Sequence, residues 1–349
     1  MSLASEVSAI RSSAGLSRSA HIVIVRVDGA GALDFLQTAS TQSPYMREGR
    51  VRHTLLLKDD ASLLADAFIV NIDDGFLVIA EGPSEAALVQ WLEQLRDRAG
   101  AKNVTVRGTS EEWTTFGVDG PYAWEVAAAF MGPTTLGQPY LTLSRREDMM
   151  CLRAGKTGEY GYLLMVPRPN EKDAEAKLHE IGKPLDLVTV TREALDVCAL
   201  ENWHFSMRQL RKTDFVKTVL TPIELQLQWR VVYTREFAGV EALRARRAEG
   251  PKARVTCFTC SAPIAPGQRV RLAGMDGDIG EVLASCDSPT LGQTVGSVLL
   301  DIRVAHPHIT FTAGEHEIRT CTASLVDNKS LRIQPHKHSY ATRNEVVTA

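Results

Sequence analysis

The chain has 349 residues, a length at which polypeptides usually divide into two or more domains. Hydrophobic residues make up 44% and charged residues 23%, which is typical of a globular protein with a sizeable core, and the formal charge of −3 provides no basic surface for nucleic acid. The longest apolar runs, such as Ile22–Val25, have the length of a strand rather than the roughly 20 residues of a membrane helix. The first residues lack the apolar segment of a secretory signal, and six cysteines do not make a disulfide framework in this length. We therefore expect a cytoplasmic protein with reduced thiols that binds neither nucleic acid nor a membrane.

Strand and helix patterns alternate through the first hundred residues. A β-branched run predicts a strand over 20–28, and the apolar spacing after it predicts a short helix over 32–39. The clearest amphipathic helix begins after Ser84, a favourable N-cap residue, and ends before Gly100. Between these two helices we expect strands over 53–57, 64–72 and 76–82.

Similar patterns return after residue 103, and their character changes after residue 250. Further strands are expected over 103–108, over 114–120 and within 151–167, with helices after Pro121, over 171–182 and over 191–202. From Arg254 to Val326, short strands alternate with Pro-Gly, Asp-Gly and single-glycine turn signals, a pattern typical of a small β barrel. We therefore predict an α+β fold with two interleaved domains over 1–250, a C-terminal β-barrel domain over 251–335 and a polar tail over 336–349.

Several common site motifs are absent or incomplete. There is no phosphate-binding glycine loop, and the GxSxG motif of the α/β-hydrolases is missing. Cys257 and Cys260 form one CxxC pair without a second, and residues three apart in a strand point to opposite faces, so we predict no zinc site. Two histidine pairs could bind a metal if their segments lay together, but we interpret them as exposed loop residues; they are His306 with His308 and His336 with His338.

Two acidic residues interrupt apolar segments. Asp66 lies within the strand-like run LLADAFIV, and Glu201 ends the helical pattern ALDVCAL shortly before Trp203 and His204. A buried carboxylate is costly unless it has a partner or a task, and a carboxylate beside aromatic rings suits a heterocycle whose N–H groups it can accept. Each carboxylate could equally face water, at a strand edge or a helix end. The residues alone leave both interpretations open.

The order of several stretches along the chain is informative. The opening AGLSRSAHIVIVRVDGAGALDFLQ is followed by GRVRHTLLLKDDASLLADAFIV, FGVDGPYAWEVA, GKTGEYGYLL, REALDVCALE, TPIELQLQW and GDIGEVLASCDSPTLGQTVGSVLL. In this order they resemble the folate-dependent aminomethyltransferase family, which includes the glycine-cleavage T-protein and tetrahydrofolate-dependent demethylases. The second stretch is similar to a hairpin with Asp-Asp-Leu-Ile-Val, and FGVDGP is similar to a segment with Leu-Gln-Gly-Pro. The resemblance extends from about Ala14 to Val326.

This resemblance implies a fold, a cofactor and several site residues. The fold is a three-domain cloverleaf around a central channel, in which two α+β domains bind folate and the barrel covers part of the channel mouth. The implied cofactor is tetrahydrofolate. Glu201 takes the place of the glutamate that binds the pterin, and Arg235 that of an arginine near the folate tail. Tyr162 lies in the stretch GKTGEYGYLL, which resembles a turn of the family.

Some residues depart from the family pattern. The unshifted alignment places Asp66 on the first aspartate of the Asp-Asp pair and Ala67 on the second, which approaches the reacting nitrogen. Either a bulge or a shortened hairpin restores Asp66 to the site, or the usual carboxylate is missing. His53 replaces a tyrosine, and about five extra residues follow Glu201, which add Trp203, His204, Arg208, Arg211 and Lys212.

These departures favour transfer of a methyl group from a small methoxy, methylthio or N-methyl donor to N5 of tetrahydrofolate. Alternatives are aminomethyl transfer of the T-protein type, for which a carrier protein could present the donor, and folate binding without catalysis. A role in iron–sulfur assembly is disfavoured, because NWHFSMRQLRKTD contains no cysteine. The candidate catalytic residues are Asp66, His53 and His204, and the candidate cofactor-binding residues are Glu201, Arg235, Trp203 and Tyr162.

Overall fold

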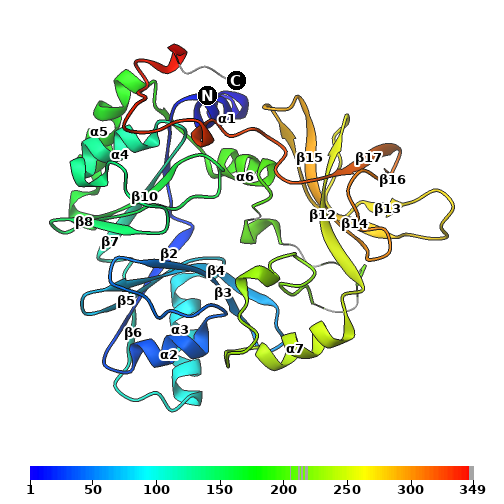
Figure 1. The fold of residues 1–349 in the computed structure, drawn as a ribbon, viewed down its shortest axis with the longest axis horizontal. Helices are drawn as coiled ribbons and strands as arrows, with labels where there is room; N and C mark the ends of the chain where they lie inside the picture. The colour runs from blue at the N-terminus through cyan, green and yellow to red at the C-terminus, as the bar shows by residue number, and fades with distance from the viewer. Residues whose placement is uncertain (205, 211–212, 214, 217–218, 346–349) are drawn as a thin grey trace.

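The protein consists of two α+β domains and a closed β barrel, which Figure 1 shows arranged around helix α6. The structure is a computed structural model that describes residues 1–345 apart from 205, 211–212, 214 and 217–218. The predicted α+β fold with a C-terminal barrel is confirmed. None of the helices in the described part of the chain is long and apolar enough to cross a membrane.

The first domain is a five-stranded antiparallel sheet in the order β3-β4-β5-β2-β6, with two helices on one face (Figure 1). Leu88 and Leu92, one turn apart on the longer helix, pack with Phe35 and Leu36 of the shorter helix against this face. The predicted N-cap is confirmed, because Ser84 accepts a hydrogen bond from the backbone of this helix. The elements are β2 (Ile22–Asp28), α2 (Ala32–Ala39), β3 (Val51–Leu57), β4 (Leu63–Ile72), β5 (Gly75–Glu81), α3 (Glu85–Arg98) and β6 (Thr105–Gly108).

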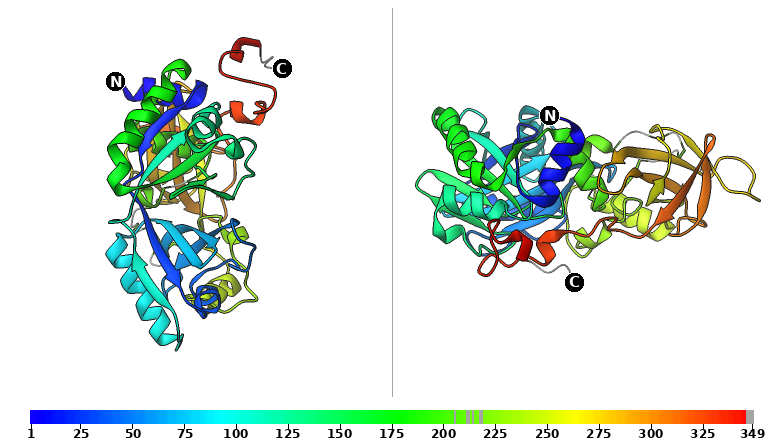
Figure 2. Two further views of the ribbon diagram at one scale, coloured as in Figure 1. Left: turned by 90° about the vertical axis from the view of Figure 1, so that its left-hand side faces the viewer. Right: turned by 90° about the horizontal axis from the view of Figure 1, so that it is seen from above.

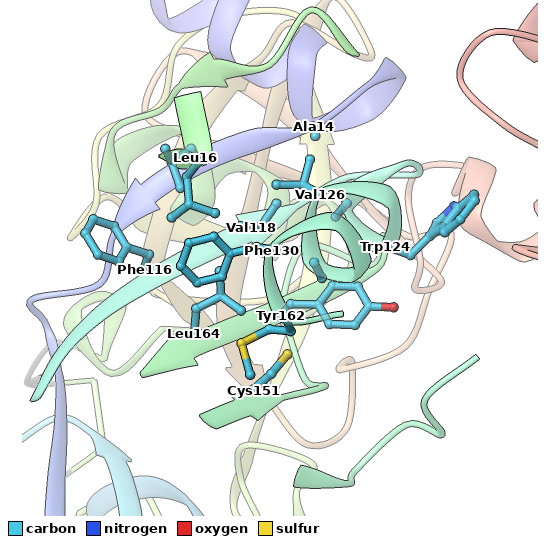
Figure 3. Packing of buried hydrophobic residues seen from close by; sticks show 14 of the residues in the cluster. Ala14, Leu16, Phe116, Val118, Trp124, Val126, Phe130, Cys151, Tyr162 and Leu164 are labelled. Atoms are coloured by element: carbon cyan, nitrogen blue, oxygen red, sulfur yellow. The ribbon is translucent and has the colours of Figure 1, made fainter. Parts of the chain in front are cut away.

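The second domain is a six-stranded sheet in the order β11-β1-β7-β10-β9-β8. Its core joins Phe116 and Leu164 of the sheet to Phe130 of α4, and Figure 3 shows Tyr162 among the same side chains. The chain begins here with α1 and β1, which the sequence analysis did not predict, and returns after completing the first domain. The elements are α1 (Leu3–Ser12), β1 (Gly15–Arg18), β7 (Trp113–Asp119), α4 (Ala123–Met131), β8 (Leu143–Arg146), β9 (Met149–Leu152), β10 (Gly161–Pro167), α5 (Glu171–Gly182), β11 (Val188–Thr189) and α6 (Arg192–Glu201).

The two sheets face each other, and apolar residues fill part of the space between them. Leu77 and Ile79 of β5 belong to one buried cluster with Leu152 of β9 and Met165 of β10. The remaining space between the sheets is where the candidate site lies.

The third domain is a closed barrel in the order β12-β15-β14-β13-β16-β17, reached through α7. Phe258 and Phe311 fill its interior. After the last strand, residues 322–345 cross back to the second domain, as the views in Figure 2 show. The elements are α7 (Val240–Glu249), β12 (Ala253–Cys260), β13 (Arg269–Arg271), β14 (Gly280–Ser288), β15 (Gln293–Asp301), β16 (Thr310–Ala313) and β17 (His316–Cys321).

The described part of the segment expected as a polar tail is attached to the second domain. Tyr340 is buried there, and its ring meets that of Tyr122 edge to face at 5.3 Å. Its hydroxyl donates to Asp186 at 2.5 Å, and its backbone N–H donates to Glu125. The C-terminal segment (residues 322–345) thus joins the barrel to the second domain.

Candidate functional site

A cavity with about 810 Å³ of empty space, part of it open to solvent, lies between the two sheets. Strands β1, β7 and β10 supply one wall, β4 and β5 supply the other, and α6 contributes a side. Its size and mostly apolar lining with a few convergent polar groups are typical of small-molecule sites. The polar and aromatic side chains that line it include Ser17, Ser19, His21, Asp66, Phe68, Glu81, Asp119, Lys156, Thr157, Tyr162 and Arg192.

Asp66 reaches this cavity beside a bulge in the first hairpin. Leu56 pairs with Ala65, but Leu57 pairs with Leu63, so that β4 has one extra residue. A shift of one residue exchanges the two faces of a strand. Asp66 consequently lines the cavity, while Ala67 packs in the core of the first domain. The sequence left open whether a bulge brings Asp66 to the candidate site or the carboxylate is missing there. In the structure, Asp66 lines the candidate cavity beside a bulge.

Lys156 links two carboxylates on neighbouring strands. Asp66 on β4 and Glu81 on β5 are direct partners in the sheet. The Nζ atom of Lys156 lies 2.8 Å from Asp66 Oδ2 and also contacts Glu81 Oε2. The other oxygen of Glu81 lies 3.3 Å from Arg192 Nη2 and accepts a hydrogen bond from the backbone N–H of Met207. Because like charges opposite each other in a sheet repel, the ammonium group between them stabilises the arrangement.

Arg230 and His53 hold the second oxygen of Asp66. Asp66 Oδ1 lies 2.7 Å from Nε2 of His53 and 3.0 Å from Nη1 of Arg230, and these two nitrogens are 3.0 Å apart. An ionised carboxylate can only accept, so we assign the imidazole proton to Nε2, which donates it to Asp66 and leaves the lone pair on Nδ1; Arg230 Nη1 then donates to Asp66 rather than to His53. His53 stacks on Phe68 with 4.4 Å between ring centroids and does not itself line the cavity. His53 therefore orients Asp66 from behind.

The charges of this network are fixed at neutral pH. Burial acts to raise the pKa of the Asp66 carboxyl, but Lys156, His53 and Arg230 outweigh it and hold this pKa well below its usual range. Burial acts to lower the pKa of Lys156, and the two carboxylates overcome that effect and raise it. Asp66 is therefore an ionised carboxylate, and Lys156 is a cation.

The histidines near the cavity are neutral. Burial lowers the pKa of His53, against the attraction of Asp66. Burial, with the repulsion of nearby cations, lowers the pKa of both His21 and His204 to about 4. Each imidazole is therefore uncharged at neutral pH, with a proton on one ring nitrogen and a lone pair on the other.

Asp119, at the end of β7, is a carboxyl of a different kind. Its Oδ1 accepts a hydrogen bond from the hydroxyl of Thr157 at 3.2 Å. Burial raises the pKa of Asp119 to about 7, and Thr157 and the more distant Arg11 offset this only in part. Asp66 and Asp119 thus differ in charge at the same cavity: Asp66 is ionised, whereas Asp119 exchanges a proton near neutral pH.

Glu201 lies outside the cavity. Its side chain is fully buried, and Oε2 accepts hydrogen bonds from Nε and Nη2 of Arg11 at 3.0 and 2.6 Å. Its Oε1 accepts a hydrogen bond from the hydroxyl of Ser288 in the barrel at 2.6 Å. The residue expected to bind the pterin therefore joins α1, α6 and the barrel in this structure.

The other predicted residues are dispersed. Tyr162 lines the cavity, and burial raises its pKa so that it remains protonated. Arg235 donates to the carbonyls of Gln37 and Ser40 at 2.8 and 3.2 Å, where α2 ends. Trp203 packs in a cluster between the first domain and the barrel. His204 is close enough to Asp66 and Arg230 to be influenced by their charges, but it does not line the cavity.

The basic residues of the insertion are only partly described. Arg208 lies 3.1 Å from Glu193 at the surface. Arg211 and Lys212 lie outside the described residues.

No metal site is formed by the residues that the structure describes, since no three His, Cys, Asp or Glu side chains converge on one point. The predicted exposure of His306, His308 and His336 is confirmed. His338 is half-buried, and its Nδ1 accepts a hydrogen bond from the backbone of Gln334.

Sequence reasoning missed six charged residues of the cavity and its network: Glu81, Asp119, Lys156, Arg192, Asp196 and Arg230. Glu81 left a usable signal, because pairing residues outward from the turn at 73–74 places it opposite Asp66. Arg230 left none, since 164 residues separate it from Asp66.

Comparison with known proteins connects this site to a family. A sequence model described as the GCVT N-terminal domain matches residues 1–235. The chain is 29% identical over 313 residues to an aminomethyltransferase of Streptomyces avermitilis, covering 86% of this chain and 81% of that protein. It is 25% identical over 305 residues to an aminomethyltransferase of Corynebacterium aurimucosum, covering 84% and 80%.

A solved structure shows the same fold. The aminomethyltransferase T of the glycine cleavage system from Bartonella henselae superposes with a TM-score of 0.80 and 20% identity, covering 93% of this chain and 89% of that one. The family model accounts for most of the chain. The protein therefore belongs to the aminomethyltransferase (GCVT) family and is a folate-dependent transferase that uses tetrahydrofolate.

Proposed function

We propose that the protein transfers a one-carbon unit from an aminomethyl donor to tetrahydrofolate in the cavity between the two sheets. The observation that carries this proposal is the ionised Asp66 carboxylate, which Lys156, Arg230 and His53 hold at the wall of a mostly apolar cavity. The relatives named above support an aminomethyl donor; nothing among them favours the methyl donors preferred in the sequence analysis.

The residues of the cavity fit tetrahydrofolate. Phe68, Ile79 and Leu163 offer apolar and aromatic surfaces for a flat ring system. The buried Nε atom of Arg192 has no hydrogen-bond partner in the described part of the chain and is a donor for a carbonyl or carboxylate. When bound, tetrahydrofolate supplies the nucleophilic nitrogen that accepts the carbon unit.

The network around Asp66 is suited to a cationic donor. An aminomethyl group carries a protonated amine, and an ionised carboxylate in a partly dry cavity holds an ammonium group strongly. Lys156 already places such a group against Asp66 and Glu81, so a donor would compete with Lys156 for these oxygens. For methylene-tetrahydrofolate to form, the carbon would lose its bonds to this nitrogen and to the rest of the donor and gain bonds to two nitrogens of tetrahydrofolate. The two N–H protons of the acceptor would leave with the ammonia and with the rest of the donor.

The proposed donor is a small molecule, and the same group attached to a carrier protein is the second possibility. Identification of the folate product by mass spectrometry separates the alternatives. With an aminomethyl donor, we expect methylene-tetrahydrofolate and an equal amount of ammonia. Formation of methyl-tetrahydrofolate from methoxy, methylthio or N-methyl donors would overturn our proposal and show that the protein is a demethylase. Binding of folate without formation of either product would show that the protein binds folate but does not catalyse the transfer.

A matched pair of variants connects the product to the site. Asp66→Asn keeps the shape of the side chain and removes its charge, so product formation should fall. Asp276→Asn makes the same change at an exposed position of the barrel and should have no effect.

A further inference from the structure

Three oxygen atoms gather around one point on the wall formed by β1 and β7. Ser17 and Gly117 are direct partners in the sheet. A Cβ atom placed on Gly117 would lie 2.6 Å from Ser17 Oγ, 3.0 Å from Ser19 Oγ and 3.6 Å from Asp119 Oδ2. All four residues line the cavity. We call this group of Ser17, Ser19 and Asp119 the serine–aspartate recess; the glycine beneath it keeps the space open.

Two of these oxygens have unused hydrogen-bonding capacity. Ser17 is 2% exposed, and its Oγ has no hydrogen-bond partner among the described residues. Asp119 uses Oδ1 to accept from Thr157, whereas its Oδ2 has no hydrogen bond to the described part of the chain. Buried polar atoms are nearly always satisfied, so an unpartnered hydroxyl beside a cavity points to a partner that the cavity receives.

Glycines also surround the other oxygen of Asp119. A Cβ atom on either Gly155 or Gly161 would lie 3.0 Å from Asp119 Oδ1. Neither glycine, nor Gly117, has a positive φ, so their backbones could accommodate other residues. What these glycines provide is space around the carboxyl group.

The surroundings of Asp119 favour its neutral form. Arg11 from α1 is the cation that faces it, and it weakens the effect of burial only in part. On α6 it faces Cys198, whose pKa burial raises, so that this thiol stays uncharged near neutral pH. A pKa of about 7 for Asp119 means that the carboxyl offers one O–H donor and one acceptor below that pH.

We propose that the serine–aspartate recess binds the lactam edge of a flat heterocycle, where a ring N–H and a C=O group stand side by side. Asp119 donates its proton from Oδ2 to the C=O group and accepts from the N–H group, and Ser17 donates to the same carbonyl. This inference rests on the proposed function, because the pterin ring of a folate carries such an edge. It also gives the ring a polar partner inside the cavity, from which Glu201 is separated by its bonds to Arg11 and Ser288.

The test measures binding rather than turnover. The probe is 5-formyltetrahydrofolate, which resists oxidation, titrated calorimetrically into the full-length protein at about pH 6 and about pH 8.5. If only protonated Asp119 binds, the affinity falls roughly 30-fold between these values. Asp119→Asn, whose amide presents a fixed donor and acceptor, should bind within about 3-fold of the unmodified protein at the lower pH and lose the pH dependence. Asp119→Leu removes the hydrogen bonds to both the C=O and the N–H group, so the affinity for the probe should fall about 10-fold or more.

Ser17→Ala separates binding from folding. The hydroxyl that it removes has no partner in the described structure, so the melting temperature should stay the same or rise, while the affinity falls by about 3- to 10-fold. Ser8→Ala, at an exposed position of α1, is the matched control and should change neither quantity.

The outcomes also distinguish this inference from the proposed function. If the protein binds the probe equally at both pH values and the Asp119 and Ser17 variants match it, the recess is not the binding site, but folate binding stands. Affinity that rises with pH would show that ionised Asp119 binds, and would overturn the lactam assignment. If the unmodified protein does not bind at all, both proposals fail.

Discussion

Asp66 and Glu201 are both buried carboxylates paired with an arginine, but they face different spaces. Asp66 shares its oxygens among Arg230, His53 and Lys156 and lines the cavity. Glu201 has both oxygens occupied by Arg11 and by the barrel, and it lies where α1, α6 and the barrel meet. Burial and ion pairing are therefore alike in the two networks. Access to an open space is what separates a carboxylate that can meet a ligand from one that holds domains together.

The largest expected effect concerns stability at Glu201. Arg11→Met leaves this carboxylate buried without its ion-pair partner and should lower the free energy of unfolding by about 3–5 kcal/mol. Urea denaturation measures this change. The double variant Arg11→Met/Glu201→Gln should recover a large part of the loss, because it removes the unpaired charge. A loss below about 1 kcal/mol for Arg11→Met would mean that Glu201 is not confined as the structure has it.

The second prediction concerns turnover at Asp66. Asp66→Asn should lower kcat/KM by about 10²- to 10³-fold, the size expected when a preorganised charge is lost from a reaction site. The folate affinity should change by less than about 3-fold, because the neutral amide keeps the shape of the site. Steady-state kinetics and calorimetry measure the two quantities, with Asp276→Asn as the control. An equal loss in both would assign Asp66 to folate binding instead.

Low pH should lower the stability of the protein through a buried histidine near Asp66. Burial and nearby cations lower the pKa of His204 to about 4, so between about pH 6.5 and pH 4 the unfolded imidazole binds a proton that the folded one does not. Stability therefore falls as the pH falls through this window. Between these two pH values, the free energy of unfolding of His204→Gln should fall by about 1–3 kcal/mol less than that of the unmodified protein. Denaturation curves at the two pH values measure this difference. His316→Gln, at an exposed barrel position, should leave the curves unchanged, and equal curves for His204→Gln would contradict the prediction.

The smallest effect is expected at Arg235. Arg235→Ala removes hydrogen bonds to the carbonyls of Gln37 and Ser40 and should cost about 1 kcal/mol of stability. If these contacts persist when folate binds, the affinity for 5-formyltetrahydrofolate stays the same. A clear loss of affinity would show that Arg235 leaves the end of α2 and binds the folate tail, as the resemblance implied.

Local patterns predicted much of the fold. The helix after Ser84 and the barrel after residue 250 were found from capping, periodicity and turn signals, which act over a few residues. Helix α1 was missed because its short sequence LASEVSAIRS contains few large apolar residues, and its role depends on packing against α6.

The site was predicted less completely, for a physical reason. Asp66 was found because a charge in an apolar strand is unusual. Arg230 looks like any other arginine in the sequence, and Ser17 and Asp119 lie in segments where small polar residues are ordinary. Their importance arises from distances between elements that are far apart along the chain. Likewise, the sequence marked Glu201 as unusual but left open whether it is buried, and it could not show that Arg11 would bind its carboxylate.

The C-terminal segment has a mechanical consequence for the cavity. The barrel is attached to the rest of the molecule on the side of the first domain, through α7, and again through residues 322–345, which bond to the second domain at Tyr340. A rigid body fixed at two separated points keeps only one rotational degree of freedom, about the line that joins them. A rotation about that axis would also have to break the hydrogen bond between Ser288 of the barrel and Glu201 of α6, so the three contacts together hold the barrel in place relative to the two sheets.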